Sequence, residues 1–246
     1  IEGHIGVIEV LLAADPHLAV AKDGTGTTPC HWAASKGHVA AVERMLAAAP
    51  AAALAADDDG DLPIQDAASE GRVEVIDRFL AAAPVTAAVP NRDGWFALHS
   101  AAEEGETAAL RRLLAAEPST LRQATNSGDL AIHLAASNGH VDAITLLLTA
   151  APDTAMAGGW QGSLPLHTAA EGGHTEAVRS LLAAAPAAAR AADSEGDLPI
   201  HVAARNGHVD AITLLLTAAP DTAMAAGCRG GLPLHQAAVE GHAAAV

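Results

Sequence analysis

The feature that most constrains this chain is a short phrase that returns every 34 residues along its length. The phrase reads TPCHWAA, LPIQDAA, FALHSAA, LAIHLAA, LPLHTAA, LPIHVAA and LPLHQAA, and its copies begin at Thr28, Leu62, Phe96, Leu130, Leu164, Leu198 and Leu232. A fixed period of this length is typical of repeat architectures, in which each unit packs only on its neighbours. The sequence therefore predicts a single array over 1–246, with repeat bounds 1–27 (partial), 28–61, 62–95, 96–129, 130–163, 164–197, 198–231 and 232–246 (partial).

Each repeat has the pattern of two short helices. In the repeat that begins at Leu164, Pro165 suits the first helical position, where its missing N–H costs nothing. Apolar residues follow at helical spacing, and Gly173 can take the left-handed conformation that ends a helix. A second apolar helix follows and is expected to end before Pro186. One such pair cannot bury its own apolar faces, so the sequence predicts an all-α stack of helix pairs.

The phrase LPLHTAAEGGH, residues 164–174, resembles the TPLHxAAxxGH signature of ankyrin repeats. The resemblance implies an ankyrin-type solenoid of helix-turn-helix repeats, joined by turns or short β-hairpin-like loops. It also implies a non-catalytic module that binds another protein. The tetratricopeptide family shares the 34-residue period, but its Trp, Tyr and Phe landmarks are absent. One departure from the signature is that Leu replaces the helix-capping Thr in five of the seven phrases.

The two ends and one internal duplication bear on how the array is built. Both terminal repeats are incomplete, which predicts a piece of a longer array that is monomeric or associates end to end. Residues 138–157 and 206–225 are identical, which indicates duplication of a two-repeat unit.

Charge and composition narrow the kind of partner. The formal net charge is −16, from 13 Lys and Arg against 29 Asp and Glu, which disfavours nucleic acid and favours a Lys/Arg-rich protein or peptide. No apolar run approaches the roughly 20 residues of a membrane helix, and the first residues do not have the pattern of a signal peptide, so we expect no membrane insertion. Cys30 is expected in the core and Cys228 in an exposed turn. Two cysteines set no disulfide framework, which favours an intracellular location, cytoplasmic or nuclear.

The histidines are the residues that most resemble a catalytic or metal site. Twelve of the 13 fall at two repeat positions, one in the first helix and one after the inter-helix glycine. A residue that recurs in every unit is expected to serve the scaffold, by hydrogen-bonding turn and helix-junction groups. No phosphate-binding GxxxxGK[ST] or GxSxG nucleophile motif occurs. We therefore expect no enzyme activity, no catalytic residue, no cofactor and no metal.

Residues that vary while the repeat frame stays constant are the candidates for partner contact. The resemblance implies binding on a concave side, through the turn before each helix pair and the exposed end of each first helix. Over all seven repeats these positions hold 12 acidic and four basic residues. Trp32 is expected in the core. The predicted contact residues are Trp95, Trp160, Asp58, Asp59, Asp61, Glu70, Asp93, Glu103, Glu104, Asp129, Glu171, Glu195 and Asp197.

Two alternatives remain open at this point. The acidic residues at these positions can simply solvate the surface of an acidic protein. The array can also be a passive scaffold or spacer arm in a larger protein whose activity lies elsewhere.

Overall fold

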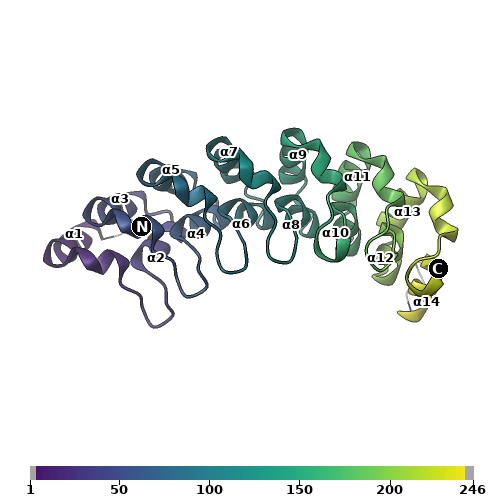
Figure 1. Ribbon diagram of the computed structural model, residues 1–246, viewed down its shortest axis with the longest axis horizontal. Helices are drawn as coiled ribbons and strands as arrows, with labels where there is room; N and C mark the ends of the chain where they lie inside the picture. The colour runs from purple at the N-terminus through teal and green to yellow at the C-terminus, as the bar shows by residue number, and fades with distance from the viewer. Residues whose placement is uncertain (1–3, 242–246) are drawn as a thin grey trace. The chain divides into compact units, whose positions relative to one another are not determined.

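The computed structural model describes residues 4–241, which form helices joined by turns, with no β-strand in that range. The predicted all-α fold of stacked helix pairs is confirmed. The chain divides into two compact units, Ile1–Thr125 (unit 1) and Asn126–Val246 (unit 2). Within each unit, the first helices of successive repeats lie side by side in one layer and the second helices in another (Figure 1).

In unit 1 each repeat contributes up to three helical segments, the last of which is a short 3₁₀ helix. The first helices are α2 (Pro29–Ser35), α4 (Pro63–Ser69) and α6 (Ala97–Glu103). The second helices are α1 (Ile5–Ala14), α3 (Val39–Ala48), α5 (Val73–Ala82) and α7 (Thr107–Ala116). The 3₁₀ helices are η1 (Pro16–Val20), η2 (Pro50–Leu54), η3 (Pro84–Ala88) and η4 (Pro118–Arg122).

Unit 2 has the same plan. Its first helices are α8 (Ala131–Ser137), α10 (Pro165–Glu171), α12 (Pro199–Arg205) and α14 (Pro233–Val239). Its second helices are α9 (Val141–Ala150), α11 (Thr175–Ala184) and α13 (Val209–Ala218). Its 3₁₀ helices are η5 (Pro152–Met156), η7 (Pro186–Arg190) and η8 (Pro220–Met224), with η6 (Trp160–Gly162) and η9 (Cys228–Gly230) in the turns before α10 and α14.

The core is formed by the alanines of the first helices, by a buried Leu or Ile in each of α4, α6, α8, α10 and α12, and by larger side chains of the second helices. Ala169 and Ala170 of α10 and Val178 of α11 are fully buried, and the Leu181 residue of α11 is only 1% exposed. Small side chains let the helix backbones approach closely, and this is why so Ala-rich a chain can still form a packed core. Cys30 is also fully buried, which confirms its predicted core position.

Leucine at the start of the first helix is accommodated by burial and by the histidine three residues on. Leu164 is buried, and its backbone N–H donates to Nδ1 of His167 over 3.0 Å. The same bond joins Leu198 to His201 over 3.0 Å. The helix start therefore keeps one half of a capping box although the threonine hydroxyl of the TPLHxAAxxGH signature is absent.

Two kinds of turn connect the repeats. In the first kind, a side-chain oxygen accepts two backbone N–H groups: Asp57 Oδ1 accepts from Asp59 over 3.0 Å and from Asp61 over 2.8 Å. The same pattern starts at Asp23, Asn91 and Asp193.

In the second kind of turn, glycine replaces that residue and the preceding repeat supplies the oxygen. Asp129 Oδ1 accepts the backbone N–H of Trp160 over 2.9 Å, and Asp197 Oδ1 accepts that of Cys228 over 2.7 Å. A Cβ added at Gly159 would overlap the Asp129 carboxylate. These turns are thus tied to the repeat before them.

Two positions 30 residues apart, one in each of two neighbouring repeats, never both hold a carboxylate. Asp61, Asp129 and Asp197 face a neutral residue 30 positions later, and Asp57 and Asp193 follow a neutral residue 30 positions earlier. The pairs are Thr27 with Asp57, Asp61 with Asn91, Trp95 with Thr125, Asp129 with Gly159, Ser163 with Asp193, and Asp197 with Gly227.

Candidate functional site

The first-helix histidines act in the scaffold, as predicted. The buried His167 accepts the Leu164 N–H at Nδ1, so Nε2 carries the proton and donates to the Asp197 carbonyl over 3.1 Å. Burial lowers the pKa of His31, His133 and His167 below the usual 6.5, which keeps the rings neutral for this double role. In one repeat Gln65 replaces histidine, accepting from Leu62 N over 2.8 Å and donating to the Trp95 carbonyl over 3.0 Å.

The residues after the inter-helix glycine connect one repeat to the next. Nε2 of His174 donates to the Ser137 carbonyl, and Nε2 of His208 donates to the Glu171 carbonyl, each over 2.8 Å. These carbonyls end the first helix of the preceding repeat and have no partner within that helix. The predicted junction role is therefore confirmed. Within residues 4–241 no three His, Cys, Asp or Glu side chains are grouped so that they could hold a metal ion.

The acidic candidates of unit 1 gather at the turns and first-helix ends. We define the acidic face as the exposed carboxylates of Asp58, Asp59, Glu70, Asp93 and Glu104, together with the partly buried Asp66 and Glu103. Two of these carboxylates already form ion pairs. Asp58 Oδ1 lies 2.9 Å from Lys22 Nζ, and Glu70 Oε2 lies 3.3 Å from Arg72 Nη2. The side chains of Asp59, Asp93 and Glu104 form no ion pair with the described residues, so they are the most available to a cationic partner.

Asp66 is the member of the acidic face that sequence reasoning missed. It lies in α4 at the repeat position of Trp32, one residue after Gln65. Burial raises its pKa to about 7, with further contributions from the carboxylates of Asp61, Asp57 and Glu70. Burial also raises the pKa of Glu103, next to Glu104. A cation at this face would therefore relieve existing repulsion.

Three predicted contact residues prove to be structural acceptors. Asp61 Oδ1 accepts from Gln65 Nε2 over 2.7 Å and from Asn91 Nδ2 over 2.8 Å, and Asp129 holds the Trp160 turn. The Asp197 side chain is only 1% exposed and pairs with Arg205, so its placement on the binding surface was wrong. In each case the carboxylate accepts a hydrogen bond from the turn of the next repeat.

The three tryptophans differ in exposure. Trp32 is 53% exposed, and Nε1 donates to Asp23 Oδ2 over 3.1 Å, so its predicted core position was wrong. Trp95 is only partly exposed, because its ring packs 6.2 Å from the His99 ring at 57°. Trp160 is 56% exposed, as its turn position predicted.

In unit 2, Trp160 lines a pocket of about 310 Å³, which we call the Trp160 pocket. Exposed Glu171 and partly exposed Asp129 contribute carboxylates to it. The pocket is thus formed by the turn before α10, by α10 itself and by α8 and its preceding turn. The complete lining is Ser127, Asp129, His133, Leu134, Ser137, Trp160, Ser163, Thr168 and Glu171. The remaining candidate, Glu195, is exposed in the turn before α12.

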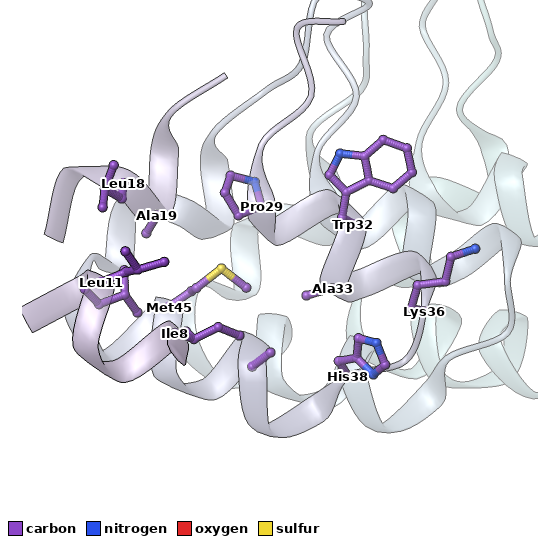
Figure 2. A pocket seen from close by; sticks show the side chains of 12 residues that line it. Ile8, Leu11, Leu18, Ala19, Pro29, Trp32, Ala33, Lys36, His38 and Met45 are labelled. Carbon is purple, nitrogen blue, oxygen red and sulfur yellow. The ribbon is translucent and has the colours of Figure 1, made fainter. Parts of the chain in front are cut away.

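A second pocket, of about 330 Å³, opens between α1, η1, α2 and α3. Figure 2 shows Leu11 and Leu18 on one side of it and Trp32 and Lys36 on the other. In other repeats of unit 1 a first helix packs on the second helix of the same repeat, as α4 does on α5. Among residues 4–241 no first helix of the same repeat packs on α1. The apolar side chains of α1 that such a helix would cover therefore line the pocket.

Comparison with known proteins gives a consistent result. The family model described as ankyrin repeats (3 copies) matches residues 1–88, 78–158 and 152–226. The crystal structure of the human ASB11 ankyrin repeat domain is similar, with 22% sequence identity and a TM-score of 0.74. The match covers 88% of this chain and 96% of that one. No curated protein matches the sequence. Within residues 4–241 no helix has the length and apolar character needed to cross a membrane.

Proposed function

Because this chain belongs to the ankyrin repeat family, whose members are generally protein-interaction modules, we propose that it binds a Lys/Arg-rich protein or peptide on the acidic face of unit 1. Binding requires no chemistry beyond recognition, so the proposed role is non-catalytic. The free thiols of Cys30 and Cys228 fit a reducing compartment, and we propose the cytoplasm or nucleus as the site of action.

The observation that carries this proposal is the crowding of carboxylates on the acidic face. Asp66 has a pKa raised to about 7 by burial and by nearby acids, and its neighbours include exposed carboxylates without an ion pair. Such a surface attracts cations over a distance and therefore speeds the encounter with a basic partner. A merely solvating surface would not need carboxylates placed where their mutual repulsion is costly.

The test is the association rate of a partner at two salt concentrations. Partners are captured from cell extract on the immobilised chain and identified by mass spectrometry, and one is purified for surface plasmon resonance. Asp59→Lys, Asp93→Lys and Glu104→Lys together should slow association about 10-fold at low salt, because steering is lost. The difference should fade at about 0.5 M salt, where the Debye length is only a few ångströms.

The matched control has the same charge change on the second helices, with Glu74→Lys, Asp142→Lys and Asp210→Lys. These three residues are also exposed. The control should associate at close to the wild-type rate. Equal slowing of both variants would overturn the acidic face as the binding surface, and a failure to retain any stable partner would favour the passive spacer.

A further inference from the structure

We infer that the Trp160 pocket of unit 2 accepts an arginine side chain of the bound partner. The inference rests on the proposed function, because it requires a protein or peptide partner, and it names one side chain that such a partner presents. It is carried by a comparison within unit 2, between the Trp160 pocket and the equivalent place 68 residues further along.

The equivalent place is already filled by an arginine of the chain itself. Arg205 of α12 stands where Ser137 stands in α8. Its Nη2 pairs with the Asp197 carboxylate and its Nε donates to Gln236 Oε1 over 3.4 Å. These two partners correspond by position to Asp129 and Thr168, which line the Trp160 pocket. The scaffold at this place is therefore able to hold a guanidinium group.

The Trp160 pocket lacks that internal arginine and has gained groups that suit an external one. The short Ser137 side chain leaves about 310 Å³ open. Trp160 replaces Cys228 and provides an aromatic face, and Glu171 replaces Val239 and adds a carboxylate. A planar guanidinium can stack on an indole while its N–H groups donate to carboxylates, which a lysine ammonium cannot do with the same geometry.

The Asp129 carboxylate and the turn that carries Trp160 are held in place before binding. Asp129 Oδ1 accepts the Trp160 N–H over 2.9 Å, and Ser127 Oγ donates to Asp129 Oδ2 over 2.8 Å. An ionised carboxylate has about four lone-pair sites, so it can accept from a guanidinium as well. The Glu171 side chain is exposed and forms no ion pair with the described residues. Ordering on binding would therefore be confined to the Trp160 and Glu171 side chains.

The experiment titrates the ¹⁵N-labelled chain with acetyl-Gly-Gly-Arg-Gly-Gly-amide and follows the indole N–H signals by NMR. Trp32 and Trp95 serve as internal controls for Trp160. The peptide should shift the Trp160 signal saturably. The citrulline peptide, which is close in shape but uncharged, should bind at least about 10-fold more weakly, and the lysine peptide should also bind more weakly.

Ser137→Arg is the decisive variant, because it should fill the pocket from within as Arg205 fills its equivalent. It should abolish the saturable shift, whereas Thr149→Arg, which adds the same charge at an exposed site on α9, should leave it unchanged. Circular dichroism is used to check that Ser137→Arg is folded. Glu171→Gln is a second, milder variant and should weaken binding at least about 3-fold.

Equal shifts with the arginine and citrulline peptides, or an unchanged titration in folded Ser137→Arg, would overturn the arginine assignment. Neither result would affect the slowing of association by charge reversal on unit 1, which tests the proposed function separately. If charge reversal has no effect but the arginine peptide still binds selectively, the pocket is retained and the acidic face is rejected.

Discussion

Asp66 in α4 is ionised at a cost to the fold. Burial and neighbouring carboxylates raise its pKa from 3.8 to about 7. Between about pH 4 and pH 7 the folded state therefore binds a proton that the unfolded state has released, so this group lowers stability as pH rises. Asp66→Asn should be more stable than the wild type at pH 8, by roughly 1–3 kcal/mol, and the gain should vanish near pH 4.

Urea unfolding of both proteins at pH 4, 6 and 8 measures this difference. Asp142→Asn, at an exposed position of α9, is the control and should change the free energy of unfolding by less than about 0.5 kcal/mol. A gain for Asp66→Asn that is the same at all three pH values would contradict the titration of Asp66 as its cause.

Exposure of single residues was the part of the site that sequence reasoning predicted least well. The average repeat places Asp197 on the surface, but its carboxylate is covered by Arg205 of the next repeat, and no other repeat has arginine at that position. Trp32 looked like core because it follows His31, yet its indole lies outside and bonds to Asp23. Both outcomes depend on contacts with one particular neighbour, which a pattern averaged over repeats does not contain.

At the scale of one helix pair, the buried histidine is expected to make the free energy of unfolding fall in acid. Burial lowers the pKa of His167 below 6.5, against the opposing effect of the Asp197 carbonyl bond and of Asp193 and Asp197. The unfolded state therefore takes up the proton more readily, and stability is lost as pH falls through about 6.5. His167→Gln should remove this loss.

Gln65 provides the precedent, because it makes both hydrogen bonds of the histidine in its own repeat. His167→Gln should stay within about 1 kcal/mol of the wild type at pH 7.5 and exceed it in stability at pH 5. His167→Ala should lose about 2–4 kcal/mol at pH 7.5, since it leaves two buried backbone groups without a partner. Denaturant unfolding at the two pH values gives these differences, and equal acid sensitivity in His167→Gln would assign it to other groups.

Helices were the most predictable elements, because apolar spacing recurs in every repeat and proline or glycine marks most of their ends. The predicted end of the first helix near Gly173 and of the second before Pro186 agrees with α10 and α11. The 3₁₀ helices were not predicted. Those that follow the second helices share only the proline at their start, and the same proline marks the end of the preceding helix.

At the scale of the whole chain, stability is expected to be local. Within each unit, helices contact those of the same or the adjacent repeat, so a cavity should loosen mainly its own surroundings. Leu181→Ala in α11 should lower the hydrogen-exchange protection of unit 2 by about 2–4 kcal/mol and leave α2 to α5 unchanged.

Phe79→Ala in α5 is the reciprocal variant, since Phe79 holds the same repeat position in unit 1 and is fully buried. It should loosen unit 1 and spare α11 to α13. Hydrogen exchange followed by mass spectrometry resolves the two regions. Uniform loss of protection throughout the described residues, in either variant, would mean that the array opens as one block.

The placement of carboxylates along the turns limits how a gene for such an array can lengthen or shorten. Loss of residues 130–163 alone would bring Asp129 opposite Asp193, two like charges where a hydrogen bond now holds the turn. Gain or loss of two repeats together keeps each carboxylate opposite a neutral neighbour. Duplication of two repeats at once therefore avoids this repulsion, which agrees with the identity of residues 138–157 and 206–225. Duplication of residues 28–61 or of 164–197 alone would likewise place two aspartates opposite each other, whereas no change of two full repeats does so.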